Sequence, residues 1–263
     1  MDRRSFNIGM AAAAAVAASK SLAASPAAPA PAVPTGGKRL QIGMIIFDGM
    51  TNQDFVGAHD MFAAQRSADT HVLAKTRAPI TTDRRLQVLP HMAIEESPDL
   101  DILFVGGGPG STALMTDPEV IDFVKQQGER AQYVTSVCSG ALVLGAAGLL
   151  RGYKAATHWA AMEILPILGA TPVYERVVFD RNRFTGGGVT AGIDFGLAVV
   201  GKIWGEDAAR MLQLISEYDP QPPYDSGSPR TAKPELVARA RKVLEPLTAG
   251  RIAAAKTMAG RFA

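Results

Sequence analysis

The sequence predicts an α/β fold in which a mostly parallel sheet is covered by helices on both faces. Short, mostly apolar runs at residues 41–47, 101–105 and 131–137 have the composition of buried parallel strands. Segments with helical spacing lie between these runs, and such alternation is typical of a helix-covered parallel sheet. The mature part of the 263-residue chain is long enough for one such domain with a sizeable core.

Turn and capping residues mark the ends of several predicted elements. Asp48-Gly49 ends the first strand with a turn signal, and Asp54 lies near the start of the helix that follows. Asp117 and Pro118 are typical of an N-cap and a first helical position. The other predicted elements are a strand at 71–74, a short hairpin within 80–91, a strand at 101–105, a helix at 118–130, a strand at 131–137, a helix from 139 to 145, strands at 173–179 and 183–185, a helix at 192–204, and a basic helix at 234–244 with a short Ala-rich end.

Composition excludes several classes of function. The 27 Lys and Arg residues are scattered among 25 Asp and Glu residues, so no basic stripe predicts a nucleic-acid partner. One cysteine excludes an intrachain disulfide and a Cys-rich metal site. The four histidines have no metal-ligand spacing, so we expect no metal.

The N-terminus has the pattern of an export signal. Arg3-Arg4-Ser5-Phe6 is followed by a weakly apolar run and then by small residues around Ala23-Ala24-Ser25. This order predicts a twin-arginine signal peptide at residues 1–25, and therefore a periplasmic protein without stable membrane association. An Ala/Pro-rich linker at 26–38 then precedes the folded domain, residues 39–263.

Cys138 is the candidate nucleophile. It follows a buried strand and precedes Ser139-Gly140 and a helix of small residues, the arrangement of a nucleophile elbow. Its place at a helix N-terminus favours a thiolate, which is a strong nucleophile at neutral pH. The alternative is a small buried hydrophobic residue, because free cysteines are often buried.

A glycine-rich loop, residues 106–110, follows another strand at the same predicted sheet edge, where ligands bind in open α/β sheets. The N–H groups of Gly107 and Gly108, with that of Ser139, predict an oxyanion-hole type of site. A tight turn or a phosphate loop is the alternative, although the Gly-Lys-Ser/Thr ending of a phosphate loop is missing. The run 186–188 predicts a turn before the helix that contains Asp194.

Two further side chains are candidates for proton transfer. Asp54 could carry a proton beside the sulfur, or it could cap a helix. His158 could orient or deprotonate Cys138, or it could be a structural histidine at a helix start.

Several longer motifs resemble one known family. They are residues 133–140 (Tyr-Val-Thr-Ser-Val-Cys-Ser-Gly) with 142–153, Thr157-His158-Trp159, residues 185–195 (Thr-Gly-Gly-Gly-Val-Thr-Ala-Gly-Ile-Asp-Phe), 53–57 (Gln-Asp-Phe-Val-Gly) and 222–229. Together they resemble the isonitrile hydratase branch of the ThiJ/PfpI superfamily, from about Arg39 to the early 240s. The elbow is specific to the superfamily, whereas the run 185–194 indicates this branch.

The resemblance implies a flavodoxin-like fold, a homodimer, and hydration of a small-molecule isonitrile to an N-substituted formamide without metal or organic cofactor. It implies that Cys138 is the nucleophile and Asp54 the acid/base group. Ser139 stands where the branch usually has threonine; it keeps the hydroxyl, which is expected to position water. The export signal is a second departure from this branch.

Three other functions stay open. His158 close to Cys138 would favour a cysteine hydrolase acting on peptides or amides. An exposed thiol of low pKa would favour a redox or glyoxal-handling stress protein. Amidase-like sensor domains of transcription regulators suggest a ligand-binding module, although no helix-turn-helix pattern follows the domain here.

Overall fold

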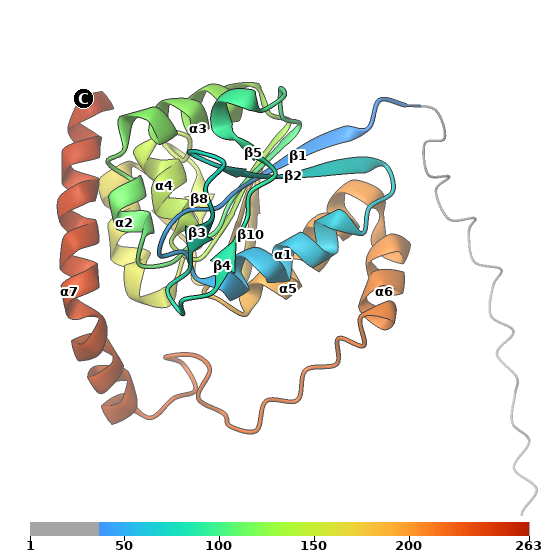
Figure 1. The fold of residues 1–263 in the computed structure, drawn as a ribbon. Coiled ribbons are helices and arrows are strands. Elements are labelled where there is room, and N and C mark those ends of the chain that lie inside the picture. Colours follow the sequence, from blue (N-terminus) through green and yellow to red (C-terminus); the bar gives the residue numbers. More distant parts are fainter. Residues whose placement is uncertain (1–36, 263) are drawn as a thin grey trace, which may run out of the picture. The chain divides into compact units, whose positions relative to one another are not determined.

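A computed structural model describes residues 37–262, and its centre is a seven-stranded sheet (Figure 1). The strand order is β10-β11-β7-β6-β1-β2-β5, and every neighbouring pair is parallel except β10 and β11. The strands are β1 (Leu40–Ile45), β2 (Ala68–Ala74), β5 (Met92–Ala93), β6 (Ile102–Val105), β7 (Tyr133–Val137), β10 (Val177–Asp180) and β11 (Arg183–Gly186). The predicted parallel sheet is confirmed. The predicted signal peptide lies outside the described residues.

The strand register aligns the carboxyl ends of β1, β6, β7 and β11. Ile45 at the end of β1 is paired with Val105 at the end of β6, and Val105 is paired with Ser136 on β7. Gly186 on β11 is paired with Val137. Because the strands are parallel, the segments that follow β1, β6, β7 and β11 all emerge at the carboxyl edge of the sheet, the usual ligand-binding edge of such folds.

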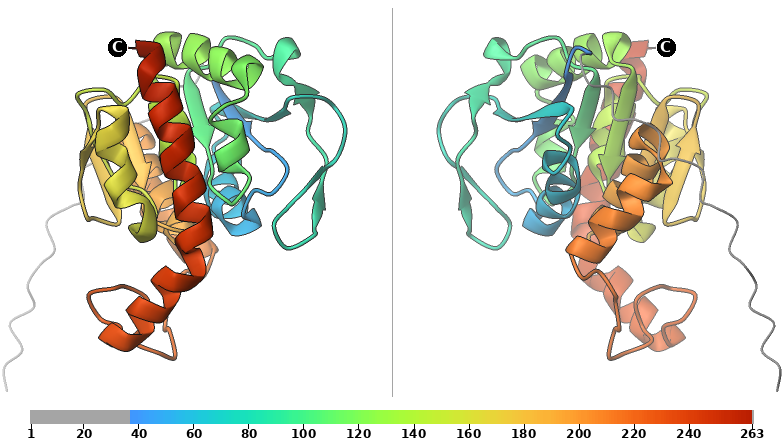
Figure 2. Two further views of the ribbon diagram at one scale, coloured as in Figure 1. Left: turned by 90° about the vertical axis from the view of Figure 1, so that its left-hand side faces the viewer. Right: turned by 90° about the vertical axis from the view of Figure 1, so that its right-hand side faces the viewer.

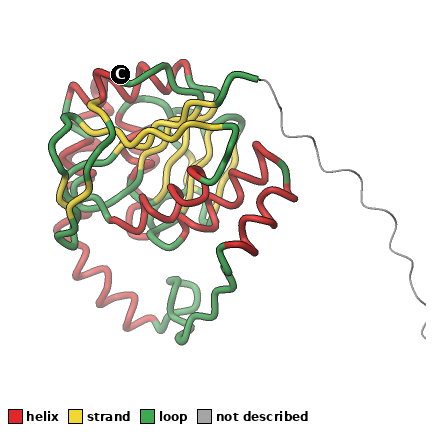
Figure 3. The backbone as a smooth tube through the Cα atoms, turned by 45° about the vertical axis from the view of Figure 1, so that its right-hand side comes forward, coloured by secondary structure: helices red, strands yellow, loops and turns green. Residues whose placement is uncertain are grey.

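Helices cover both faces of the sheet (Figure 2; Figure 3). One face carries α1 (Asn52–Ala63), α5 (Ala191–Trp204) and α6 (Glu206–Ile215); the other carries α2 (Ser111–Leu114), α3 (Pro118–Arg130), α4 (Gly140–Ala146), the 3₁₀ helix η2 (Trp159–Leu168) and α7 (Pro234–Ala259). Short elements complete the fold: β3 (Ile80–Thr81), β4 (Gln87–Val88), η1 (Ile94–Glu96), β8 (Lys154–Ala155), β9 (Thr171–Pro172) and η3 (Gly260–Phe262). None of the helices described between residues 37 and 262 is both long and apolar enough to span a membrane.

Local signals explain some of these boundaries. Asp117 caps α3 as predicted, since its side chain accepts hydrogen bonds from the N–H groups of Glu119 and Val120. The predicted hairpin is confirmed as the antiparallel pair β3 and β4. Asp54 is not a cap, because Thr51 holds the N-cap position of α1 and Asp54 lies inside the first turn.

The C-terminal helix is longer than predicted. The sequence predicted a helix at 234–244 with a short Ala-rich end, but α7 continues through Pro246 to Ala259. Its second half packs Ala254, Ala255 and Met258 into the protein, and this burial outweighs the hydrogen bond lost at a mid-helix proline. The prediction was wrong because it weighed local breakers and not this packing.

Candidate active site

Cys138 occupies a nucleophile elbow. It follows β7 and precedes α4, and its φ of 58° lies in the left-handed region that residues other than glycine seldom adopt. Backbone held in this region requires support from its surroundings and is found preferentially at functional sites. The predicted strand–cysteine–helix geometry is therefore present.

Four groups from two neighbouring segments surround the strained turn at Cys138. The N–H of Cys138 donates to the carbonyl oxygens of Gly186 (3.1 Å) and Gly187 (2.8 Å) on the neighbouring chain segment. The hydroxyl of Thr157 donates to the carbonyl oxygen of Cys138 at 2.7 Å. Val189, a β-branched residue with a φ of 40°, brings its N–H toward both Cys138 and Asp54. Two unusual backbone conformations thus meet at the sulfur.

The glycine-rich loop packs directly against Cys138. A methyl group at Gly107 would lie 2.8 Å from the Cys138 Sγ and 2.6 Å from the Ser139 nitrogen, which no side chain could tolerate without displacement. The carbonyl of Gly107 accepts from the N–H of Thr51 at 2.9 Å, which ties this loop to the segment leading into α1. Glycine is required here by close approach of two loops.

Asp54 lies beside Cys138 and is fully buried. Neither of its carboxyl oxygens has a hydrogen-bond partner of regular geometry within the described part of the chain, which is rare for a buried polar group and marks functional sites. Burial raises the pKa of Asp54 to about 7. The Cys138 thiol and the N–H groups of Val189 and Gly107 lower this pKa, whereas the negative charge of Asp83 raises it.

The pKa of the Cys138 thiol is raised, whereas its place at a helix N-terminus predicted a lowered pKa. Burial, and then the charge of Asp54, raise the pKa of Cys138 to about 12, although nearby N–H groups and Arg251 act in the opposite direction. The expectation of a free thiolate at rest was wrong because desolvation outweighs the dipole of the short helix α4. Asp54 and Cys138 therefore influence each other's titration, and Asp54 loses its proton before the thiol does.

Ser139 has its hydroxyl bonded entirely to protein. Its Oγ accepts from the N–H of Gly108 (3.0 Å) and from Arg251 Nη2 (3.0 Å), and it lies 2.9 Å from the hydroxyl of Ser111. The residue is fully buried. Its hydroxyl thus joins the glycine-rich loop to the elbow. The water-positioning role that the family resemblance implied stays a prediction.

The N–H groups of the predicted oxyanion site are directed to other groups of the protein. The N–H of Gly108 is directed to Ser139 and not to the space beside the sulfur, so its assignment was wrong. The N–H of Gly107 interacts with Asp54, and the N–H of Ser139 with the sulfur. These N–H groups therefore face Asp54 and Cys138 themselves.

His158 does not form a dyad with Cys138. Its Nδ1 accepts a hydrogen bond from the N–H of Ala160 and so caps η2. Burial, helped by the charge of Arg251, lowers the pKa of His158 to about 4, so the ring is neutral at physiological pH. The ring lies against Gly188 and lines the cavity described next, which agrees with a substrate-contacting position and not with a base.

A cavity of about 690 Å³ is lined by Thr157 and Gly187, which hydrogen-bond to Cys138. Val189, whose N–H faces Cys138, is part of its wall. The lining also includes the apolar or aromatic residues Trp159, Met162, Val173 and Tyr174 and the charged residues Glu175, Arg176, Arg230 and Arg241. The volume suits a small organic molecule.

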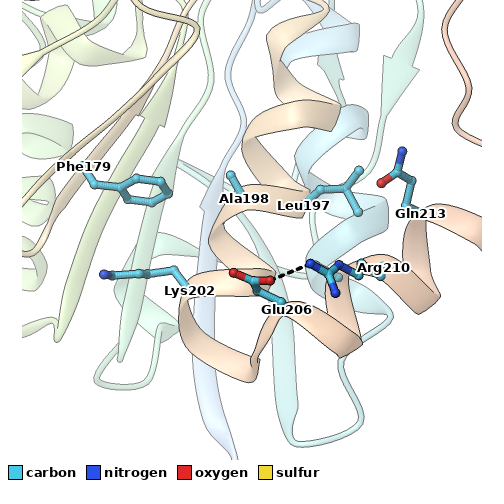
Figure 4. Close-up of a pocket in the computed structure, with 9 residues that line it drawn as sticks. Phe179, Leu197, Ala198, Lys202, Glu206, Arg210 and Gln213 are labelled. Atoms are coloured by element: carbon cyan, nitrogen blue, oxygen red, sulfur yellow. Dashed lines mark hydrogen bonds and ion pairs between the residues drawn. The ribbon is translucent and has the colours of Figure 1, made fainter. Parts of the chain in front are cut away.

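A second pocket, of about 430 Å³, lies between α5 and α6 (Figure 4). Phe179 and Leu197 form its apolar part, and Glu206 is ion-paired with Arg210 at 2.8 Å. It contains none of the predicted site residues. Across residues 37–262, no three His, Cys, Asp or Glu side chains are grouped so that they could hold a metal ion.

Comparison with known proteins identifies the family of this chain. The model of the DJ-1/PfpI family matches residues 40–202. The chain belongs to the DJ-1/PfpI family. This DJ-1/PfpI protein is 48% identical over 207 residues to an isonitrile hydratase of Pseudomonas putida, which covers 79% of this chain and 91% of the relative.

A solved structure and a transcription regulator are also similar to this chain. A ThiJ/PfpI family protein from Pseudomonas syringae, 42% identical, superposes with a TM-score of 0.81 and covers 88% of this chain and 98% of that one. An HTH-type transcriptional regulator of Pseudomonas aeruginosa is 29% identical over 202 residues, 72% of this chain but 54% of the regulator. The flavodoxin-like fold expected from the motifs is thereby confirmed.

Four residues at the site were not predicted from the sequence. Thr157, Val189, Asp83 and Arg251 each act on Cys138 or Asp54 through a bond or a charge. Thr157 and Val189 lie inside motifs that carried the resemblance, so a signal existed for them. Asp83 and Arg251 had none, because the tertiary fold alone brings the β3–β4 turn and α7 to this edge.

Proposed function

We propose that the protein is an isonitrile hydratase that adds water to an isonitrile and releases an N-substituted formamide. The observation that carries the proposal is the buried pair Asp54–Cys138 at the carboxyl edge of the sheet, in a chain 48% identical to an isonitrile hydratase. The pair supplies a nucleophile and a proton carrier that share one proton, as addition across a single carbon atom requires.

The reaction begins with the thiol of Cys138 and the carboxylate of Asp54. Asp54 removes the thiol proton while the sulfur attacks the terminal carbon of R–N≡C, and the same proton is then delivered to that carbon. The product is the thioimidate R–N=CH–S–Cys138, with Asp54 again ionised. Asp54 can both accept and release this proton because its pKa, raised to about 7 by burial, is near the working pH.

Hydrolysis of the thioimidate completes the cycle. Asp54 takes a proton from a water molecule whose oxygen attacks the thioimidate carbon. It then delivers this proton to the nitrogen, which gives the adduct R–NH–CH(OH)–S–Cys138 and leaves Asp54 ionised. This tetrahedral adduct expels the sulfur, the sulfur takes the proton of the adduct hydroxyl, and R–NH–CHO leaves. The net change is one water added to one isonitrile, so atoms and electrons balance without a cofactor.

The cavity lined by Thr157, His158 and Val189 would hold the R group. Trp159, Met162 and Val173 offer an apolar surface, and the ring of His158 is neutral. A neutral, mainly hydrocarbon R group of moderate size fits this lining.

Incubation of the purified mature protein with cyclohexyl isocyanide tests the proposal, with the formamide followed by chromatography. We expect stoichiometric conversion to N-cyclohexylformamide. Peptide and amide substrates are assayed in parallel, and their cleavage without isonitrile hydration would favour the hydrolase instead. The geometry does not favour that alternative, since His158 is bonded to Ala160 and not to Cys138. A redox role is not favoured either, since it would depend on a thiol of low pKa, and burial raises the pKa of Cys138 to about 12.

Export is a separate proposal. We propose that residues 1–25 direct the protein to the periplasm by the twin-arginine route, on the strength of Arg3-Arg4 and the segments that follow. Replacement of both arginines by lysine should retain the protein in the cytoplasm of a fractionated cell. A periplasmic location of the double variant would contradict this route.

We also propose that the protein is a homodimer. Met211, Leu214 and Ile215 of α6 are exposed apolar side chains on one short helix, and a second copy would cover them. Light scattering should give a dimer for the wild type and a monomer for Leu214→Glu. Val243→Glu, at an equally exposed position on α7, is the matched control.

A further inference from the structure

Arg251 of α7 reaches under the nucleophile elbow. Its Nη2 donates to the carbonyl oxygen of Gly108 and to the hydroxyl of Ser139, each at 3.0 Å. Ser139 is the residue after Cys138, and Gly108 follows the glycine that packs against the sulfur. One guanidinium therefore joins the two loops that form the site, from a helix that lies beyond the residues matched by the family model.

This guanidinium is buried without a carboxylate partner. Only 5% of Arg251 is exposed, no ion pair with it is present in the described part of the chain, and its Nε has no hydrogen-bond partner there. A buried charge of this kind is unfavourable unless an opposite charge lies near. The negative charges that act on Arg251 are those of Cys138 and Asp54. The positive charge is thus placed where the pair carries its single negative charge.

We propose that Arg251 is a positioning residue that holds the glycine-rich loop against the elbow and stabilises the negative charge of the Asp54–Cys138 pair when it passes to the sulfur. The proposal rests on the assigned nucleophile, and it goes beyond the proposed hydration because it concerns the reactivity of the thiol itself. It also explains why residue 139 needs a hydroxyl: the hydroxyl is the acceptor that couples Arg251 to the turn.

The charged and titratable groups that face the sulfur have opposing effects. Asp54 from α1 raises the pKa of Cys138, and Arg251 from α7 lowers it. Asp83, from the turn between β3 and β4, acts on Asp54 and raises its pKa. His158 is neutral, because its pKa is lowered by burial and by Arg251. Removal of the Arg251 charge should therefore make the thiolate harder to form.

The test measures the rate of Cys138 alkylation by iodoacetamide against pH, with intact mass as the readout and the only cysteine as the target. We expect Arg251→Gln and Arg251→Met to slow alkylation at pH 8 by about tenfold, the effect of one unit of pKa on the thiolate fraction, and to shift the profile to higher pH. Arg251→Lys keeps the charge and should retain a profile close to that of the wild type.

Arg183→Met is the matched control. Arg183 is also buried, donates its Nε to a carbonyl oxygen, that of Leu149, and has an unpartnered nitrogen, but it lies on β11 over Tyr153. Its loss should lower stability and leave the alkylation profile unchanged. Since no isonitrile is used, a protein inactive toward isonitriles can still confirm the role of Arg251.

Two results would overturn the proposal. One is a neutral Arg251 variant whose profile matches the wild type. The other is an identical profile for Arg251→Lys and Arg251→Gln, which would assign the residue a hydrogen-bonding role without a charge effect. If Arg251→Met fails to fold, Arg251→Gln decides the first result, because glutamine can still donate to Gly108 or Ser139.

Discussion

The carboxyl group of Asp54 lies beside the thiol of Cys138, and both side chains are withdrawn from solvent. The two residues are 84 positions apart in the sequence. Asp54 lies on α1, which follows β1, and Cys138 follows β7 at the same edge of the sheet. Burial raises the pKa of both groups. The charge of Asp54 raises the pKa of Cys138 further, whereas the Cys138 thiol lowers that of Asp54, so neither residue titrates independently.

Replacement of Asp54 by asparagine should stabilise the fold most at alkaline pH. The folded-state pKa, about 7, is above that of the unfolded chain, so the stabilising contribution of the protonated form is complete below about pH 4 and is lost as pH rises through 7. Asparagine cannot ionise. At about 1.4 kcal/mol per unit of pKa, we expect Asp54→Asn to gain several kcal/mol over the wild type at pH 8. Urea unfolding at pH 8 and pH 5 should show the larger gain at pH 8; equal gains would contradict a buried, ionising Asp54.

The pH profile of hydration should have an acid limb near pH 7. Asp54 must be ionised to accept the thiol proton, so kcat/KM rises as pH passes through the pKa of the pair. The charge of Asp83 contributes to the raised pKa of Asp54, hence Asp83→Asn should move the limb to lower pH. Asparagine can still accept the bond from the Thr51 hydroxyl, seen at 2.9 Å. An unmoved limb would show that Asp83 has no electrostatic role.

Alanine at Gly107 should damage the site without unfolding the protein. The added methyl would lie within 2.8 Å of Cys138 and Ser139 atoms, so the elbow must shift. Displacement of a reacting atom by about 1 Å lowers rates by about 100-fold, and we expect a loss in kcat of roughly that order. Gly201→Ala on α5, where the methyl meets only Ala209 at 3.5 Å, is the control and should retain full activity.

Valine at position 157 should weaken the support of the strained turn. It has nearly the shape of threonine but lacks the hydroxyl that donates to the Cys138 carbonyl at 2.7 Å. We expect a loss in kcat of several-fold and a destabilisation of about 1–3 kcal/mol, from the unsatisfied buried carbonyl. Comparison with Thr157→Ser, which keeps the donor, separates the hydrogen bond from packing; similar losses in both variants would argue against the bond.

The sequence predicted the features that depend on neighbouring residues. The apolar runs gave the parallel strands, Asp117-Pro118 gave the start of α3, and the strand–Cys138–helix order gave the elbow. These succeed because strand burial, capping and tight turns are written in a few consecutive residues.

The features that failed depend on residues distant in sequence. The helix dipole suggested a thiolate at Cys138, but the dehydrated surroundings that oppose it come from several elements at once. Gly108 was assigned to an oxyanion site, whereas Ser139 and Arg251 occupy its N–H and C=O groups. Arg251 itself had no local pattern, since 112 residues separate it from Ser139.

Covalent capture of the substrate tests the central claim most directly, that Cys138 attacks the isonitrile carbon with Asp54 as its proton carrier. Rapid acid quench of the wild type during turnover of cyclohexyl isocyanide, followed by peptide mass analysis, should show an adduct of one isonitrile on Cys138. Cys138→Ala should show neither adduct nor formamide. Formamide production by Cys138→Ala at the wild-type rate would contradict the account.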